Sequence, residues 1–492
     1  MNPNIIGLLI SFGFVFLVLG IATLIAKFTK GASENSRKFV HIVVGHWVFI
    51  LLMFNQLWAA VLVPFSFIIV NYLSTRFKIF KAMERNDNSY GTVYYAISLT
   101  FLVGLGFYLK WLALPFIGVL TMAYGDGFAA IVGKKWGTYK PFSFAPDKSL
   151  AGSLTVTFFS FIITALCLYF FQGQGSLVTQ SIWIILLIAL LTAIFSTFIE
   201  LTGHQGCDNL TLPIGSGLFA VLLFQFGSLP LYLFMLGATA ILLVAYFLKA
   251  ITIDGIVAAL LIAITLYALL GFLVGIALIA FFLLGSVVSK IKNKRKIEAE
   301  GLQEKGGPRT WKQVIANSLP AAIFAWLYLI LNQVFPGQYD FILLLALAVF
   351  TAATADTISS EIGMLSKETS FHILTFKKFP RGISGGVTFT GLIAGIIGSF
   401  LVATIVFINP LYGVTEYLVV AILGVLGTLV DSILGALFQR KYKNNEGMIV
   451  EASETITKPY RGFKFVTNNV VNLVALFVVS ISGFIYYLIV LF

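Results

Sequence analysis

The first candidate for chemistry in this sequence is an aspartate inside an apolar run. Asp126 lies late in a stretch that begins near Leu112, and Gly125 and Gly127 flank it. An ionisable side chain in a membrane span is costly, so it usually faces a polar cavity and has a function. Basic residues follow at the expected water boundary, namely Lys134, Lys135, Lys140 and Lys148. This combination indicates a divalent metal and phosphate groups, whereas the plainer interpretation is a buried structural aspartate beside a basic loop.

Two further motifs in the first half carry charge next to apolar runs. Arg37 and His41 are four residues apart and share a helix face, so Arg37 could clamp a phosphate and His41 could act as a base or hydrogen-bond donor. Glu200 and Asp208 border a loop, and with Asp126 they could hold Mg²⁺, which prefers oxygen ligands. The alternatives are an arginine that reaches the interface, a buried histidine with satisfied hydrogen bonds, and an Asp208 that caps a helix.

The second half has its own carboxylates and a glycine-rich turn. Asp356 and Glu361 lie five residues apart in one run, and Asp431 lies in a later run. Residues 379–387 read Phe-Pro-Arg-Gly-Ile-Ser-Gly-Gly-Val, and the turn could cradle phosphate with backbone N–H groups and Arg381. The alternative is that the glycines serve tight helix contacts and that asparagine side chains join helices.

Composition indicates a polytopic helical membrane protein. Of the 492 residues, 59% are hydrophobic and only 11% are charged, and the mean hydropathy is +0.98. About sixteen apolar runs are long enough to span a bilayer, so the predicted fold class is all-α, with about 14–16 transmembrane helices in two bundles. Two cysteines, Cys167 and Cys207, are too few for a disulfide framework or a zinc site.

The basic residues indicate the membrane topology. With the N-terminus outside, every lysine and arginine except Lys110 falls in alternate loops, which then face the cytoplasm. The net charge of +12 is therefore mainly a topology signal, and nucleic acid is not a predicted partner. The same pattern predicts a multi-pass protein of the cell membrane with its chemistry on the cytoplasmic side, where nucleoside triphosphates are.

The carboxylates near the cytoplasmic ends of the runs fall into two sets. Apolar runs abut near residues 227–230, between these sets. We therefore predict two membrane domains, residues 1–228 and 229–492, in a chain longer than one ordinary domain.

The first domain resembles the phytol kinase and dolichol kinase family, which is related to phosphatidate cytidylyltransferases. The resemblance covers roughly residues 1–226 and rests on Arg37-Lys with His41, Gly-Asp-Gly around Asp126 with Gly-Lys-Lys after it, Lys148-Ser-Leu-Ala-Gly-Ser, and Glu200 with Asp208-Asn-Leu-Thr. It implies a kinase that uses CTP, or a related nucleotide, to phosphorylate a membrane-dissolved isoprenoid alcohol. Ala151 is often glutamate in this family, so no role is assigned to this position.

The second domain resembles the membrane family that includes phytyl-phosphate kinase and the transmembrane protein 19 relatives. The resemblance covers about residues 230–492 and rests on Asp254-Gly, Arg309 with Gln313 and Asn317, Asp356-Thr with Glu361-Ile-Gly, Gly382-Ile-Ser-Gly-Gly-Val, Asp431-Ser-Ile-Leu-Gly-Ala, and Asn469 with Asn472. It implies phosphorylation of an isoprenyl monophosphate to the diphosphate.

The motifs and the two resemblances together define three predicted sets of site residues. The catalytic set is His41, Asp126, Lys148, Asp356, Arg381 and Asp431. The set for nucleotide or phosphate is Arg37, Lys38, Lys134, Lys135, Ser149, Gly152, Ser153, Arg309, Gly382, Ser384, Gly385, Gly386 and Asn469. The set for metal is Asp126, Glu200, Asp208, Asp254, Asp356, Glu361 and Asp431.

The resulting hypothesis is a bifunctional salvage kinase. With CTP or a related nucleotide and Mg²⁺, it takes an isoprenoid alcohol of the phytol, geranylgeraniol or farnesol type to the monophosphate and then to the diphosphate. No P-loop or protein-kinase signature is present, so the nucleotide would be bound by basic loops and intramembrane carboxylates. The alternatives are a CTP-dependent lipid cytidylyltransferase and a transporter of a lipid phosphate or anion. The sequence does not indicate an oligomeric state.

Overall fold

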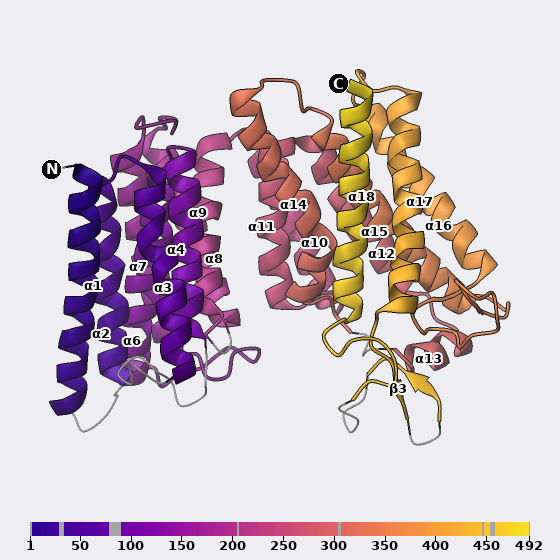
Figure 1. Cartoon of the computed structure of the whole chain (residues 1–492), viewed down its shortest axis with the longest axis horizontal. Coiled ribbons are helices and arrows are strands. Elements are labelled where there is room, and N and C mark those ends of the chain that lie inside the picture. The colour runs from indigo at the N-terminus through magenta and orange to yellow at the C-terminus, as the bar shows by residue number, and fades with distance from the viewer. Residues whose placement is uncertain are drawn as a thin grey trace. The chain divides into compact units, whose positions relative to one another are not determined.

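The computed structural model describes residues 2–28, 34–77, 90–203, 206–303, 307–444, 447–452 and 458–491. Within these residues the secondary structure is almost entirely helical, and the only named strands form two antiparallel pairs of two residues each. The chain folds as two compact units, Met1–Gly227 and Ser228–Phe492, here called unit 1 and unit 2 (Figure 1).

Unit 1 is a bundle of long helices in which one span changes its pitch. α5, η2 and α6 follow one another without a break as the span Ala113–Trp136, and η2 is a π-helical segment within it. The elements are α1 (Pro3–Phe28), α2 (Glu34–Gly45), η1 (His46–Met53), α3 (Leu57–Phe77), α4 (Gly91–Tyr108), α5 (Ala113–Leu120), η2 (Thr121–Asp126), α6 (Gly127–Trp136), α7 (Leu150–Phe171), α8 (Ile182–Thr202) and α9 (Asp208–Phe226).

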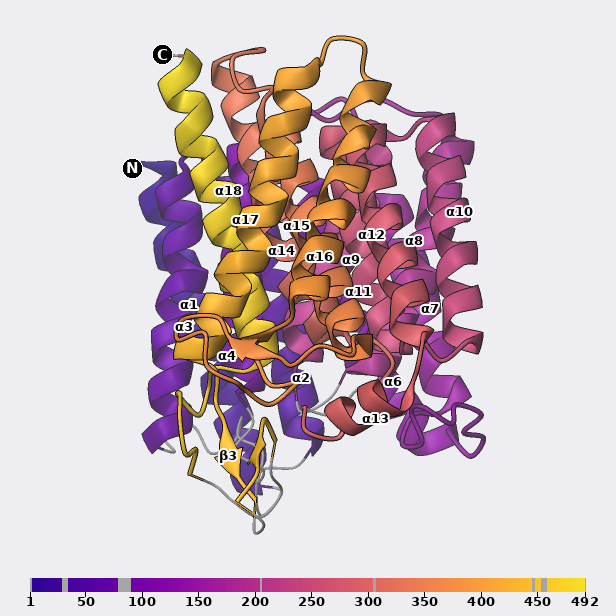
Figure 2. The ribbon, with the colours of Figure 1, turned by 90° about the vertical axis from the view of Figure 1, so that its right-hand side faces the viewer.

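Unit 2 is a second helical bundle, with short strands in its loops. Figure 2 shows α13 and β3 at the same end of this unit. The elements are α10 (Leu229–Phe247), α11 (Ile253–Leu270), α12 (Phe272–Lys290), α13 (Lys294–Glu300), α14 (Trp311–Val334), α15 (Ile342–Leu365), β1 (Phe371–His372), β2 (Gly386–Val387), α16 (Phe389–Ala403), η3 (Thr404–Ile408), α17 (Val414–Leu437), β3 (Tyr442–Lys443), β4 (Ile449–Val450) and α18 (Asn468–Leu491).

The predicted all-α, polytopic class is confirmed. In the described part of the chain, 15 helices are long and apolar enough to cross a membrane. The exception among the predicted runs is the one around residue 46, where the apolar helix is the shorter segment Lys38–Met53. Its geometry differs because α2 gives way to the 3-10 helix η1 at His46.

α2 and η1 nevertheless return the chain to the end of the bundle where α1 begins. Asn4, at the start of α1, donates from Nδ2 to Oδ1 of Asn55, which follows η1 (2.6 Å), and its own Oδ1 accepts from the Asn55 N–H (3.1 Å). Twelve α-helical and eight 3-10 residues reach about 34 Å, comparable to a hydrocarbon core of about 30 Å. The alternation of loops is therefore kept through this segment.

Close backbone contact joins the helices that carry the candidate carboxylates. In unit 1, a Cβ at Gly118 of α5 would lie 2.4 Å from the Pro213 carbonyl oxygen of α9, so this approach requires glycine. In unit 2, α15 packs against α12, α14, α16, α17 and α18, and a Cβ at Gly391 of α16 would lie 2.7 Å from the Ser359 carbonyl oxygen. Such contacts are typical of helices in lipid, where small residues let backbones approach.

Candidate active sites

In unit 1, Asp126 lies where a π-helical segment returns to α-helix. η2 ends at Asp126 and α6 begins at Gly127. A π segment inserts extra residues into a helix, changes the direction of the side chains there and is frequently found at functional sites. The Asp126 residue is only 8% exposed. A buried carboxylate of this kind requires a charged or hydrogen-bonding partner.

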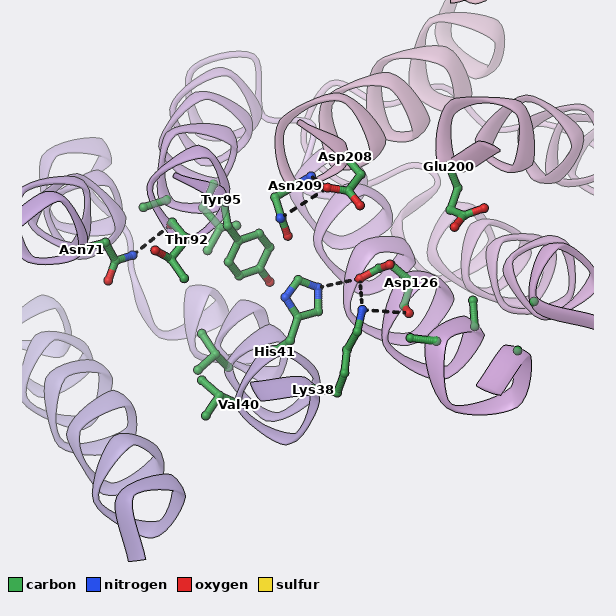
Figure 3. Close-up of a pocket in the computed structure, with 18 of the residues that line it drawn as sticks. Lys38, Val40, His41, Asn71, Thr92, Tyr95, Asp126, Glu200, Asp208 and Asn209 are labelled. Carbon is green, nitrogen blue, oxygen red and sulfur yellow. Dashed lines mark hydrogen bonds and ion pairs between the residues drawn. The ribbon is translucent and has the colours of Figure 1, made fainter. Parts of the chain in front are cut away.

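That partner is Lys38 of α2. Its Nζ lies 2.6 Å from Asp126 Oδ2 and also donates to the Asp126 carbonyl oxygen (3.3 Å), as Figure 3 shows. His41, one turn further along α2, has its Nε2 3.7 Å from the same Oδ2. Lys38 and His41 therefore meet Asp126 together. Lys38, which was predicted to bind phosphate, forms an ion pair with the Asp126 carboxylate in this structure.

A second ion pair lies beside the first. Lys148, just before α7, donates to Glu200 Oε1 near the end of α8. Burial opposes the charged form of Lys148, but the Glu200 carboxylate together with Asp126 and Asp208 outweighs it and raises the pKa of this ammonium group. The next residue, Ser149, is the N-cap of α7, and its Oγ accepts from the Gly152 N–H (3.2 Å). The Lys-Ser-Leu-Ala-Gly-Ser motif is thus a capped helix start.

Asp208 completes the acidic side of this site. It is the first residue of α9, where the helix dipole favours negative charge, and its Oδ1 accepts from the Asn209 N–H (3.0 Å). The alternative in which Asp208 is the N-cap is wrong, because Cys207 occupies that position.

These side chains line one end of a cavity of about 570 Å³ in unit 1. The polar lining includes Lys38, His41, Asn71, Thr92, Tyr95, Asp126, Lys134, Lys140, Asp147, Lys148, Glu200, Asp208 and Asn209. The apolar lining includes Val15, Leu19, Val40, Val44, Trp47, Val63, Pro64, Phe67, Ala96 and Leu99. One cavity therefore joins a charged region to an apolar region between α1, α2, α3 and α4.

Unit 2 contains a larger cavity of about 1130 Å³, with charged groups on several sides. Asp356 of α15 and Asp431 of α17 both line it. When the Asn472 amide is turned so that its nitrogen faces them, it donates to Asp431 Oδ2 and to the Asn468 carbonyl oxygen (both 3.0 Å). The remaining charged lining residues are Lys249, Lys290, Lys292, Glu300, Arg309, Glu361, Arg381 and Glu451.

Comparisons with known proteins place this architecture in a family. The family described as Integral membrane protein DUF92 matches residues 236–480. Phytol kinase of Synechocystis sp. is 35% identical over 225 residues, which cover 44% of this chain and 94% of that protein. The chain belongs to the DUF92 membrane protein family.

Two plant proteins are also similar to this member of the DUF92 family. Protein VTE6, chloroplastic, of Arabidopsis thaliana is 29% identical over 246 residues, covering 50% of this chain and 66% of that protein. Protein PGR of the same organism is 28% identical over 256 residues, covering 48% of this chain and 88% of that protein. No solved structure matches the chain.

The structure gathers most of the predicted first-unit residues around the smaller cavity. Those that line it are Lys38, His41, Asp126, Lys134, Lys148, Ser149, Gly152, Ser153, Glu200 and Asp208. Lys135 does not line it, because its Nζ lies over the Trp136 ring (4.6 Å to the ring centroid). The Arg37 side chain lies outside the described residues.

The predicted second-unit residues also converge, with one exception. Those that line the larger cavity are Arg309, Asp356, Glu361, Arg381, Gly382, Ser384, Gly385, Gly386, Asp431 and Asn469. Asp254, predicted as a metal ligand, does not line it. Instead its Oδ2 accepts from the Trp311 N–H (3.3 Å), so this carboxylate of α11 satisfies an N–H group at the start of α14.

Arg309 reaches the larger cavity between two aromatic rings. Its guanidinium carbon lies 5.2 Å from the ring centroids of both Phe281 and Phe282. Burial lowers the pKa of Arg309 to about 10, and the nearby Glu361 carboxylate opposes this shift. Arg309 thus remains a cation at neutral pH and is a ready binding group for an anion.

The glycine-rich turn is packed more tightly than an open phosphate cradle. Gly382 and Gly385 have positive φ angles of 83° and 90°, and a Cβ at Gly385 would lie 2.5 Å from Ala436 Cβ. The Ser384 N–H is already bonded to Glu451 Oε1 (2.7 Å). Arg381 donates to the Glu368 carbonyl oxygen. The glycines therefore fit the alternative in which they serve tight packing contacts. A phosphate that bound the Ser384 N–H would have to displace the Glu451 carboxylate.

The structure adds charged groups that sequence reasoning missed. Lys296 has no exposed surface; its Nζ lies 2.5 Å from Glu361 Oε2 and donates to the Ser289 and Ile291 carbonyl oxygens at the end of α12. Nothing in the basic linker distinguished this lysine from its neighbours. Glu451 is 3% exposed and lies in the loop between α17 and α18, where it had no apolar context to mark it.

The carboxylates at the two cavities suit a metal that takes few ligands from the protein. In the described part of the chain, no three His, Cys, Asp or Glu side chains come together as a metal cluster. Mg²⁺, however, is usually held by one or two carboxylates together with phosphates and water. Among the carboxylates that line the cavities, Asp126 and Asp208 in unit 1 interact electrostatically, as do Asp356 and Asp431 in unit 2. These pairs fit that mode of binding.

Breaking the Lys148–Glu200 pair is expected to destabilise unit 1. In Lys148→Met, the Glu200 carboxylate stays buried without its partner, so the free energy of unfolding should fall by about 3 kcal/mol. Thermal unfolding of the purified chain in detergent measures this loss. Lys148→Met/Glu200→Gln should recover most of it, and Lys140→Met, on the same loop, should change little. A double variant no more stable than the single one would contradict the pairing.

Proposed function

We propose that this protein is a kinase that phosphorylates an isoprenoid alcohol in unit 1. The observation that carries the proposal is the smaller cavity, which joins a charged region to an apolar region. An isoprenoid alcohol has the same division, since its hydroxyl is polar and its chain is apolar. The similarity to a protein named phytol kinase supports the same substrate class.

In unit 1, Asp126, Lys38 and His41 are the residues proposed to act on the alcohol. The alcohol oxygen attacks the γ-phosphorus of CTP, the bond to the β-phosphate oxygen breaks, and CDP leaves with that electron pair. His41 takes the alcohol proton. Asp126 stabilises the resulting imidazolium, because its Oδ2 lies 3.7 Å from His41 Nε2. Lys134 and Lys148, at the charged end, offset the phosphate charge. Asp126 and Asp208 would hold Mg²⁺, which would supply positive charge to offset that of the phosphates.

Unit 2 is proposed to phosphorylate the monophosphate to the diphosphate. Its cavity is larger and is lined by several lysine and arginine side chains, which suits two phosphorylated ligands at once. Arg309 and Arg381 bind phosphates, while Asp356 and Asp431 are the Mg²⁺ ligands. The same reaction applies, with a phosphate oxygen of the isoprenyl monophosphate as the nucleophile.

The basic loops support an orientation with both sites toward the cytoplasm of a cell membrane. All lysines and arginines except Lys110 lie in alternate loops between the apolar runs or at the ends of the runs that flank those loops. Cytoplasmic CTP and a lipid dissolved in the bilayer would then reach each cavity from different directions.

A substrate panel tests the proposed function. The purified chain should convert phytol, geranylgeraniol or farnesol to the monophosphate with CTP, and thin-layer chromatography with mass spectrometry would identify the products. UTP and ATP in parallel define the donor. Product without Mg²⁺, or no product from any prenol with any nucleotide, would contradict the proposal. Release of pyrophosphate with a CDP-lipid would instead identify a cytidylyltransferase.

A further inference from the structure

Tyr95 in the smaller cavity has a buried hydroxyl without a hydrogen-bond partner. It lies on α4 and is 9% exposed, and its Oη has no partner among the described residues. A buried hydroxyl left unpaired is costly, so such groups in native structures usually have a reason. The Tyr95 ring packs against the His41 ring at 5.1 Å between centroids, and Figure 3 shows its hydroxyl directed toward the space beside His41.

Tyr95 also marks the height at which the cavity changes from polar to apolar. Along α4, the lining residues Thr92, Tyr95 and Leu99 share one face and run from polar to apolar. Along α2 and η1, the lining runs in the same way from Lys38 through His41 to Val44 and Trp47. Tyr95 and His41, whose rings touch, are the last polar residues of the cavity lining on α4 and α2.

An amphiphile bound in this cavity would place its polar terminus at that boundary. Its apolar chain fits beside Val44 and Leu99, and a hydroxyl deeper in the cavity would meet fewer polar groups than at the boundary, although Trp47 Nε1 lies in the apolar lining as a donor without a partner among the described residues. A hydroxyl at the boundary lies next to Tyr95 Oη and next to the proposed base His41.

We propose that the Tyr95 hydroxyl hydrogen-bonds the hydroxyl of the substrate and makes unit 1 selective for an alcohol over an otherwise identical apolar lipid. This inference rests on the proposed function, because it names the residue that recognises the acceptor. A phenol can donate and accept, so it can hold the alcohol oxygen while His41 accepts the alcohol proton. A lipid without the hydroxyl would leave the buried Tyr95 hydroxyl unpaired, and a site built to hydrogen-bond a hydroxyl discriminates strongly against such a ligand.

The test compares Tyr95→Phe with the unchanged full chain in detergent. Equilibrium binding is measured for geranylgeraniol and for the hydrocarbon of the same carbon skeleton without the hydroxyl. Tyr95→Phe should reduce the preference for the alcohol about tenfold and leave hydrocarbon affinity unchanged. In kinetics, KM for the alcohol should rise about tenfold, with KM for CTP and the monophosphate reaction unchanged. Tyr94→Phe, at a residue that does not line the cavity, is the matched control and should match the wild type.

The outcomes separate this inference from the proposed function. A Tyr95→Phe variant with wild-type alcohol preference would overturn the inference, as would an equal loss of affinity for both lipids, which would indicate a structural role. A wild-type chain without any alcohol preference would overturn it as well. Preferential binding of the alcohol without phosphorylation would overturn the proposed function alone, since binding needs no turnover.

Discussion

Asp126→Asn is expected to abolish phosphorylation of the isoprenoid alcohol while leaving phosphorylation of the monophosphate intact. The change removes the charge that holds Lys38 at 2.6 Å and faces His41 at 3.7 Å, so the base loses its stabilising partner and the lysine its anchor. Loss of positioned acid–base chemistry together with a metal ligand should lower kcat by about 10³-fold or more. Initial rates with each substrate, measured on the same purified variant, give the result.

The variant must be shown to be folded for this result to count. The monophosphate reaction of unit 2 serves as an internal control, because the substitution is in the other unit. Asp147→Asn provides a matched control in unit 1, since Asp147 is an exposed carboxylate at the same cavity and has no predicted role in catalysis. Alcohol phosphorylation within about threefold of wild type in Asp126→Asn would remove Asp126 from the mechanism.

Asp356→Asn and Asp431→Asn are expected to give the reverse pattern. Both carboxylates face the larger cavity from α15 and α17. Each supplies half of the proposed Mg²⁺ site, so either change should lower formation of the diphosphate by about 10³-fold and leave the alcohol reaction unchanged. Monophosphate should then accumulate when the alcohol is supplied, and its amount over time is the measurement.

Asp340→Asn is the control for the second unit, because Asp340 lies outside the larger cavity and accepts instead from the Tyr328 hydroxyl (3.1 Å). It should form the diphosphate at the wild-type rate. If Asp356→Asn and Asp431→Asn did the same, unit 2 would have no role in a second phosphorylation, and the proposal would reduce to one kinase.

The fold class was predictable because the signal is strong and local. Apolar runs of spanning length and basic residues in alternate loops do not depend on tertiary packing. The run around residue 46 was the exception, since neither composition nor charge shows that α2 changes to a 3-10 helix at His46. The π-helical turn that presents Asp126 was equally invisible, because a pitch change depends on how neighbouring helices pack.

The candidate sites were predictable as sets of residues but not as pairs. Intramembrane carboxylates are few, so Asp126 and Asp356 stood out on cost alone. The sequence did not show that Lys38 would meet Asp126, 88 residues away, or that Glu451 would meet Ser384, 67 residues away. Lys296 was missed for a related reason: burial of one lysine in a basic linker depends on the helices around it. Asp254 was assigned a metal by motif, whereas its carboxylate accepts from the first residue of α14, 57 residues away.

The most direct test of the central claim follows a labelled phosphate. Purified wild-type chain receives geranylgeraniol and CTP labelled at the γ-phosphate, and lipid products and nucleotides are separated over time. The account predicts label first in the monophosphate and then at both phosphates of the diphosphate, with two CDP released for each diphosphate. Label found only in pyrophosphate, or no label in any lipid while the alcohol stays unchanged, would contradict it.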